Sequence, residues 1–221
     1  MRRIFIVASV VFAVTVTCAL QARATVIVTN PSFEVDTFDH WPGNVTENFP
    51  ITGWDVILPD WAGINNSSIP YWGYETMDAH PFLQGQTPPD GLQAAYLQYH
   101  GQLSQSVSGF EVGTTYTLSY YEAGRKEGTV ASPYAKVGTE YVVPEHAMPY
   151  TGTFTLMTGT FTATAETMTL VLGGGDAFRE AGDCAINYDL VAITSVPEPS
   201  TLSLLGVGLA GLLAYAWRKR R

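Results

Sequence analysis

Alternation of apolar and polar residues along the middle of the chain predicts β-strands. In Thr115–Tyr121 the side chains of Tyr116, Leu118 and Tyr120 point to one face, while the hydroxyl-bearing residues between them point to the other. A similar two-residue period, in segments rich in threonine, valine and tyrosine, marks residues 92–99, 153–156, 168–172 and 185–196. Turn residues separate these segments at short intervals, which is typical of an all-β domain.

Between the two ends of the chain, no window has the 3.6-residue apolar period of an amphipathic helix. Residues 25–195 are enough for one domain with a substantial core and too few for two ordinary domains. A single large sheet would leave one apolar face exposed to water, so the strands predict two packed antiparallel sheets, a β-sandwich.

An uninterrupted apolar run occupies the N-terminal end. Arg2 and Arg3 precede the run of residues 4–20, and Ala22-Arg23-Ala24 follows it. This arrangement predicts a secretory signal peptide over residues 1–24, with a signal helix and cleavage by signal peptidase after Ala24. The two arginines leave twin-arginine export as an alternative, but the short positive region favours the general secretory route.

A second apolar run lies at the C-terminal end, between a proline-bounded motif and a cluster of cations. Val196-Pro197-Glu198-Pro199 precedes the run of residues 201–217, and Arg218, Lys219, Arg220 and Arg221 follow it. As a helix the run is about 25 Å long, close to the roughly 30 Å of a hydrocarbon core. Since terminal cations stay cytoplasmic, the pattern predicts a transmembrane helix with the domain outside the inner membrane.

This three-part tail, residues 196–221, resembles the PEP-CTERM sorting signal of bacteria that make exopolysaccharide. The resemblance implies an exosortase-type transpeptidase as partner and cleavage near Pro-Glu-Pro. The processed domain is then released from the cell or attached to its surface. An ordinary single-pass membrane anchor is the alternative.

The expected mature domain is strongly acidic, which narrows its partners. Its cations are Arg125, Lys126, Lys136 and Arg179, set against 19 of the 20 acidic residues, for a net charge of about −15. Such a surface repels nucleic acid and anionic lipid and suits calcium, or neutral and cationic ligands. Cys184 is the one cysteine left after signal cleavage, so we expect a buried free thiol and no intramolecular disulfide.

Five short motifs follow one another between residues 30 and 191. They are Asn30-Pro31-Ser32-Phe33-Glu34, Thr52-Gly53-Trp54, Pro89 to Leu97, Gln105-Ser106-Val107 with Gly113 to Tyr120, and Tyr188-Asp189-Leu190-Val191. In this order they resemble a galactose-binding-domain-like jelly roll, the antiparallel β-sandwich of many carbohydrate-binding modules. The resemblance implies a structural calcium held by Glu34 and Asp189, with main-chain carbonyls of residues 30–36 completing the site. The alternative is that both are ordinary surface carboxylates.

Tryptophan and tyrosine concentrate in the irregular stretch between residues 36 and 90. Exposed tryptophans in loops are costly unless something covers them, and the apolar faces of sugars stack on such rings. We therefore predict polysaccharide contacts by Trp41, Trp61, Tyr71 and Trp72, with packing of the loops on themselves as the alternative. Trp54 belongs to the Gly-Trp motif and is expected in the core.

No arrangement of residues points to catalysis. His40, His80, His100 and His146 are spread singly, without metal-ligand spacing, and no Gly-x-Ser-x-Gly elbow occurs. Residues 173–176, Gly-Gly-Gly-Asp, lack the lysine of a phosphate loop and suggest a turn. The sequence thus predicts an exported, non-catalytic protein that binds carbohydrate. A structural matrix protein without a defined ligand and a small glycan-active hydrolase are the alternatives.

Overall fold

The structure is a computed structural model, and it describes residues 26–36, 50–57, 62–68, 83, 86–125, 129–149, 151, 153–180, 182, 184–196 and 201–219. The predicted signal peptide, residues 1–24, lies outside this part of the chain.

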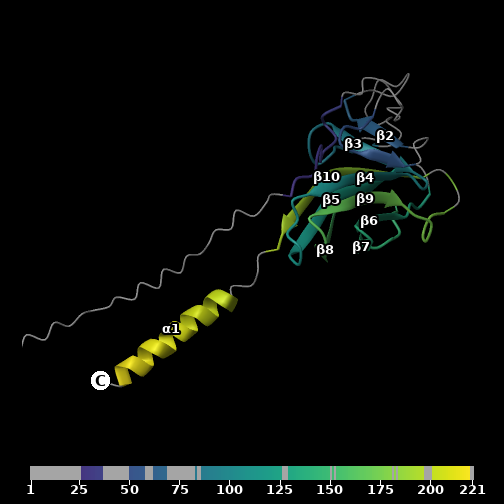
Figure 1. The fold of residues 1–221 in the computed structure, drawn as a ribbon. Coiled ribbons are helices and arrows are strands. Elements are labelled where there is room, and N and C mark those ends of the chain that lie inside the picture. The colour runs from purple at the N-terminus through teal and green to yellow at the C-terminus, as the bar shows by residue number, and fades with distance from the viewer. Residues whose placement is uncertain are drawn as a thin grey trace, which may run out of the picture.

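The described strands form two five-stranded sheets that face each other (Figure 1). The first sheet has the order β1 (Asp55–Ile57), β4 (Gln102–Ser108), β9 (Thr167–Gly174), β6 (Pro133–Val137) and β7 (Glu140–Val143). The second has the order β2 (Ala62–Asn66), β3 (Gln93–Gln98), β10 (Ala185–Ser195), β5 (Thr115–Gly124) and β8 (Thr155–Thr162). All pairings within the sheets are antiparallel, so the predicted all-β antiparallel sandwich is confirmed.

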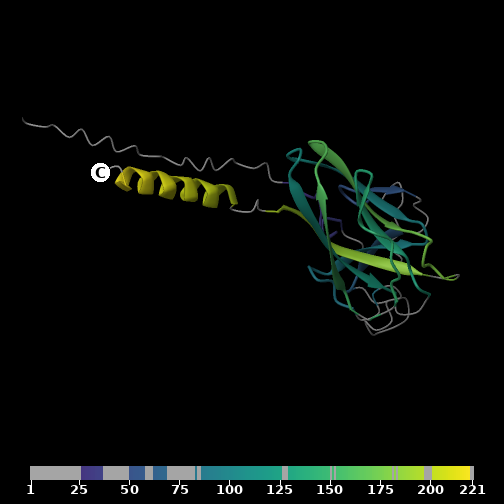
Figure 2. The ribbon, with the colours of Figure 1, turned by 90° about the horizontal axis from the view of Figure 1, so that it is seen from below.

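The core lies between the two sheets, and β5 shows how the sequence builds it. Tyr116, Leu118 and Tyr120 are buried, as their alternation predicts, and they belong with Leu170 and Leu172 of β9 to one apolar cluster. Burial of such side chains supplies the main drive for folding, roughly 1.5–3 kcal/mol for each large one. Figure 2 shows the two layers from below, with the long strand β10 running through the second.

Trp54 and Cys184 occupy the places expected for them. Trp54 is 5% exposed, its ring packs 5.4 Å from that of Phe33, and its indole Nε1–H donates a hydrogen bond to the carbonyl of Asn30. Cys184 is a free cysteine and is buried in the core. The Gly-Trp motif, in the turn after residue 51, thus packs against the N-terminal motif of residues 30–34.

Two strand limits differ from those predicted. β8 begins at Thr155, so residues 153 and 154 lie outside it, and it continues to Thr162. Gly173 and Gly174 end β9 rather than form a turn. A side chain on Gly173 would overlap the ring of Tyr134, and one on Gly174 would overlap the carbonyl of Tyr99, so close contacts across the sheet exclude a Cβ there.

A helix, α1 (Thr201–Lys219), follows the sandwich and covers the predicted apolar run (Figure 1). Its described leucines, with Tyr215 and Trp217, are exposed. Across the described residues, no helix has the length and hydropathy that crossing a membrane requires. The predicted transmembrane helix is therefore not confirmed.

Candidate functional site

The two predicted calcium ligands lie together beside one turn of the chain. Glu34 accepts hydrogen bonds on Oε1 from the main-chain N–H groups of Leu92 and Gln93. Asp189, on β10, accepts one on Oδ2 from the N–H of Asp90 at 2.9 Å. The first and last motifs of the domain are thus joined through the turn that precedes β3.

Gly91 makes this arrangement sterically feasible. Its φ of 65° lies in the left-handed region, and a methyl group there would overlap the carboxyl of Glu34. The N–H of Val191 also donates to the carbonyl of Pro31 at 2.9 Å, which fixes β10 against the N-terminal motif. The glycine of the Pro-Asp-Gly sequence therefore allows the carboxylate of Glu34 to approach the main chain closely.

Burial leaves Asp189 in an unfavourable electrostatic setting. Its side chain is fully buried, and desolvation raises the pKa of its carboxyl to about 7, with the nearby carboxylates of Asp90 and Glu34 adding to the rise. The hydrogen bonds from Asp90 and Leu190 lower the pKa but do not offset the burial. A cation bound nearby would favour the ionised form of Asp189 at neutral pH.

The residues fit a calcium ion on one condition. Within the described residues no salt bridge reaches Glu34, Asp90 or Asp189, so no side-chain cation neutralises them. In the same part of the chain no three His, Cys, Asp or Glu side chains converge on one metal position. Calcium takes about six to eight oxygen ligands, so main-chain carbonyls must supply much of the site.

A row of amides crosses the outer face of the second sheet, the face turned away from the core. Asn65 of β2 donates from Nδ2 to Oδ1 of Asn187 on β10 at 3.0 Å, and Asn187 donates to the carbonyl of Ala123 on β5 at 3.4 Å. Tyr96 and Ala185 form a small apolar cluster on this face, separate from the main core. We call Asn65, Tyr96 and Asn187 the amide face.

Two buried amide oxygens near this face have no hydrogen-bond partner in the part of the chain that the structure describes. They are Oδ1 of Asn65 and Oε1 of Gln86, whose Nε2 donates to the carbonyl of Gly124 at 3.2 Å. A buried acceptor without a donor costs roughly 1–3 kcal/mol, and hydroxyl groups of a ligand or water are suitable donors. Sequence reasoning missed these residues, although the alternation of Asn187 with the core residue Tyr188 places the amide on the outer face.

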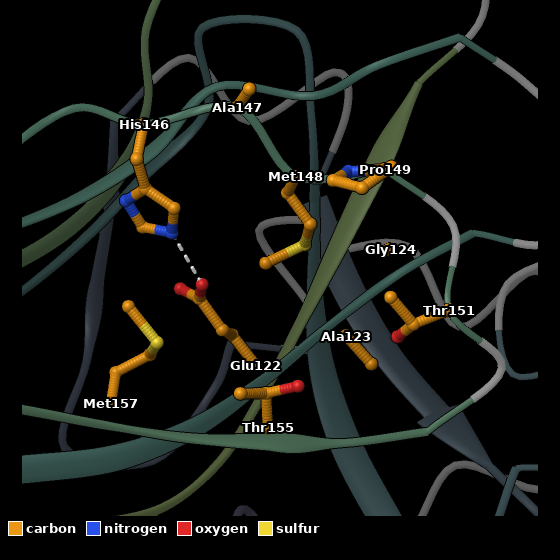
Figure 3. Close-up of a pocket in the computed structure, with 10 residues that line it drawn as sticks. All are labelled: Glu122, Ala123, Gly124, His146, Ala147, Met148, Pro149, Thr151, Thr155 and Met157. Atoms are coloured by element: carbon orange, nitrogen blue, oxygen red, sulfur yellow. Dashed lines mark hydrogen bonds and ion pairs between the residues drawn. The ribbon is translucent and has the colours of Figure 1, made fainter.

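A cavity of about 160 Å³ opens near the end of β5 and contains a histidine–carboxylate pair (Figure 3). Nε2 of His146 lies 2.6 Å from Oε1 of Glu122, and Nδ1 of His146 lies 3.0 Å from the carbonyl of Pro144. Because a carbonyl only accepts, Nδ1 carries a hydrogen, and the second proton lies between Nε2 and the carboxyl. Figure 3 shows Met148 and Met157 on either side of the pair.

Burial raises the pKa of Glu122, and the hydrogen bond to Glu122 raises that of His146, so the pair retains a shared proton to higher pH than either free group. Both ring nitrogens are occupied by protein groups, which leaves none directed at a substrate. Since Glu122 lies on β5 and His146 follows β7, the pair links the two sheets. Single-sequence reasoning had no means of pairing residues so far apart.

Most of the other predicted site residues lie outside the part of the chain that the structure describes. Trp41, Trp61, Tyr71 and Trp72 lie outside the described residues, so their predicted sugar contacts stay predictions. The same holds for Pro197, Glu198, Pro199, Arg220 and Arg221. The N–H of Val196 donates to the carbonyl of Thr115 at 2.9 Å, which ties the start of the tail to β5, and Arg218 and Lys219 lie in the last turn of α1.

Comparison with known proteins identifies the tail first. Residues 195–221 match the PEP-CTERM protein-sorting motif, which confirms the resemblance drawn from the Pro-Glu-Pro sequence, apolar run and terminal cations. No curated protein sequence matches the chain.

Solved structures identify the fold. The N-terminal CBM22-1–CBM22-2 tandem domain of Xyn10C from Paenibacillus barcinonensis matches with a TM-score of 0.50 and 15% identity, over 80% of this chain and 47% of that chain. This chain therefore spans about half of that tandem structure. TmCBM61, solved with β-1,4-galactotriose, matches with a TM-score of 0.47 and 15% identity over 76% of this chain and 97% of that chain. Such low identity establishes the β-sandwich fold alone.

Proposed function

We propose that the protein is an exported carbohydrate-binding protein of the cell surface or extracellular matrix, without catalytic activity. The single observation that favours this function is the amide face, where Asn65 has a buried acceptor oxygen without a partner among the described residues, on the outer face of a carbohydrate-binding-module-like sandwich. Amide and phenol groups can bind the hydroxyl groups of a neutral polysaccharide, and because Asn65, Tyr96 and Asn187 are buried, such binding would require this face to be uncovered. The strongly acidic domain also disfavours anionic ligands.

The predicted aromatic residues belong to the same part of the chain. Trp61 directly precedes β2, and Tyr71 and Trp72 stand in the sequence between β2 and β3, the two strands that contribute Asn65 and Tyr96. In our proposal these rings, with Trp41, stack on sugar rings while the amides bind hydroxyl groups. One stacked ring contributes about 1 kcal/mol, so a single site binds weakly and many copies on a surface bind well.

A structural calcium ion is the second element of the proposal. Glu34 and Asp189 would hold it with main-chain carbonyls, and the ion would neutralise the buried carboxylate of β10. Asn187 and Asp189 are two positions apart on β10, so calcium would stiffen the strand that carries the amide face. The resemblance to galactose-binding-domain-like jelly rolls supports this ligand set.

Processing is the third element. The PEP-CTERM match supports export of a membrane-anchored precursor and recognition by an exosortase-type transpeptidase near residues 197–199. Signal peptidase would remove residues 1–24, leaving residues 25–195 as the functional domain. The mature protein would then be found at the cell surface or outside the cell.

Affinity electrophoresis tests the proposed function. Neutral polysaccharides in the gel should retard the protein, and Trp61→Ala and Trp72→Ala should each reduce retardation while the melting temperature changes little. Trp54→Ala is the matched control, because it removes a core side chain and should cost about 3–5 kcal/mol of stability. If no polysaccharide retards the wild type and the loop variants unfold as readily as Trp54→Ala, the rings are packing residues and the matrix-protein function is favoured.

A further inference from the structure

One edge of the second sheet is a long strand whose outward main-chain groups have no partner among the described residues. β8 has eight residues and five exposed side chains, and its only strand partner within the described residues is β5. No other main-chain hydrogen bond reaches residues 155–162 in that part of the chain. An edge of this kind is a template for another strand.

The other three edges of the sandwich are protected. β1 has three residues and carries the exposed Asp55, and β7 has four residues, begins at the exposed Glu140 and is followed by Pro144. β2 is buried along almost its whole length. Short length, charge, proline and burial are the usual ways in which proteins prevent edge pairing, and β8 has none of them.

The absence of charge around β8 is notable in this acidic domain. Residues 147–165 contain no Asp, Glu, Lys or Arg, whereas the domain as a whole has a net charge of about −15. Two copies repel each other over most of their surfaces, and this edge is a place where they can meet without opposed carboxylates. The exposed residues of β8 are four threonines and Leu156, which suit cross-strand pairing.

β7 approaches β8 from the core side. Gly159 pairs with the core residue Leu118, and the carbonyl of Val142 approaches Gly159 from the core side, where a Cβ would overlap it. β7 therefore contacts β8 from beneath the sheet, and no strand among the described residues pairs with the outer hydrogen-bonding edge of β8.

We propose that β8 pairs antiparallel with β8 of a second copy of this chain, around a two-fold axis near Gly159. The pairing joins two five-stranded sheets into one continuous ten-stranded sheet. A two-fold interface uses the same surface on both copies, so one uncharged strand is sufficient to form it. A single strand pair is a small contact, and association should therefore be weak in dilute solution and effective where copies are concentrated at a surface.

Sedimentation equilibrium of the full-length chain in detergent tests the proposal. The wild type should be a reversible dimer. Thr158→Lys/Thr160→Lys places like charges opposite each other across the axis and should weaken dimerisation by about tenfold. The matched control is Ser106→Lys/Thr169→Lys, an exposed cross-strand pair on the outer face of the first sheet, which should leave the dimer unchanged.

A charge-swapped mixture separates loss of the interface from loss of folding. Thr158→Lys/Thr160→Lys mixed with Thr158→Glu/Thr160→Glu should form a heterodimer at least as stable as the wild-type dimer. A wild type that stays monomeric at all concentrations overturns the proposal. So does a dimer that both lysine pairs leave intact, because association then belongs to α1 or to another face.

Discussion

Asp189→Asn is expected to change how stability depends on pH more than it changes stability itself. In the wild type without calcium, the pKa of this carboxyl rises from 3.8 unfolded to about 7 folded. A raised pKa means that the folded state holds the proton more tightly than the unfolded state. Stability is therefore highest below pH 3.8 as far as this group is concerned, and it is lost as the pH rises toward 7.

The size of the effect follows from the two pKa values. One unit of pKa difference corresponds to about 1.36 kcal/mol, so a shift from 3.8 to about 7 lowers stability by about 4 kcal/mol above pH 8. Between pH 5 and 8 the loss is about 2.5 kcal/mol. Asparagine does not ionise, so the variant lacks this slope. It also loses one of the two acceptor oxygens bonded to Asp90 and Leu190, a constant cost of about 1 kcal/mol.

Urea unfolding of both proteins between pH 5 and 8, with a chelator present, measures the difference. The stability difference between wild type and Asp189→Asn should move in favour of the variant by about 2.5 kcal/mol across this range. Titrating groups that do not interact with Asp189, including Glu122 and His146, affect both proteins equally and cancel in the difference.

Calcium provides the second half of the test. An ion bound to Asp189 stabilises the ionised form, so calcium affinity of the wild type should fall by about tenfold for each unit of pH below 7. A calcium concentration of about 100 Kd should add about 2.7 kcal/mol to the wild type and nothing to the variant. Parallel pH curves for the two proteins would refute the burial argument, and identical wild-type unfolding with calcium and chelator would refute the calcium site.

Gly91→Ala should displace the carboxyl of Glu34 and lower stability by about 1–3 kcal/mol in circular-dichroism melts, with weaker calcium binding; a wild-type melting curve would count against the close contact. His146→Gln should flatten the pH dependence of stability above pH 6.5, the ordinary pKa of histidine. The raised pKa of His146 contributes stability in the wild type, and this stability disappears as the pH rises. An unchanged pH profile in urea unfolding would contradict the shared proton. Intact-mass measurement of protein from the native host should find a product that begins near Thr25 and ends near Pro197, and a dominant species that retains Trp217 would favour a plain anchor.

The sandwich was predictable because strands such as β5 and β9 alternate between buried and more exposed positions. Tyr116, Leu118 and Tyr120 all lie inside, and the strands expected at 92–99, 168–172 and 185–196 correspond to β3, β9 and β10. Alternation indicates which face of a strand is buried, but it does not indicate which groups from other parts of the chain contact that face. The sequence of Gly173 and Gly174 predicts a turn or loop, because the ring of Tyr134 and the carbonyl of Tyr99, which exclude a Cβ there, come from residues distant in the sequence.

The candidate site was predictable in part. The neighbourhood of Glu34 and Asp189 followed from a family resemblance, and the sequence alone offered no reason to join residues at opposite ends of the domain. The contact between Asn65 and Asn187 could not be predicted from the sequence, because it depends on the sheet order that places β2, β3 and β10 side by side. The Glu122–His146 pair likewise depends on how two sheets pack, which no local pattern encodes.

The last strand of the sandwich leads into the sorting motif without a linker. β10 ends at Ser195, the motif begins at residue 195, and Val196 is still hydrogen-bonded to Thr115. In our proposal, a transpeptidase acting near residues 197–199 would work one to three residues beyond the last hydrogen bond of a folded strand. The group joined to the cleaved end would then lie next to the rigid strand β10. A domain attached in this way would rotate little about its attachment point. The attachment would therefore determine the orientation of the amide face.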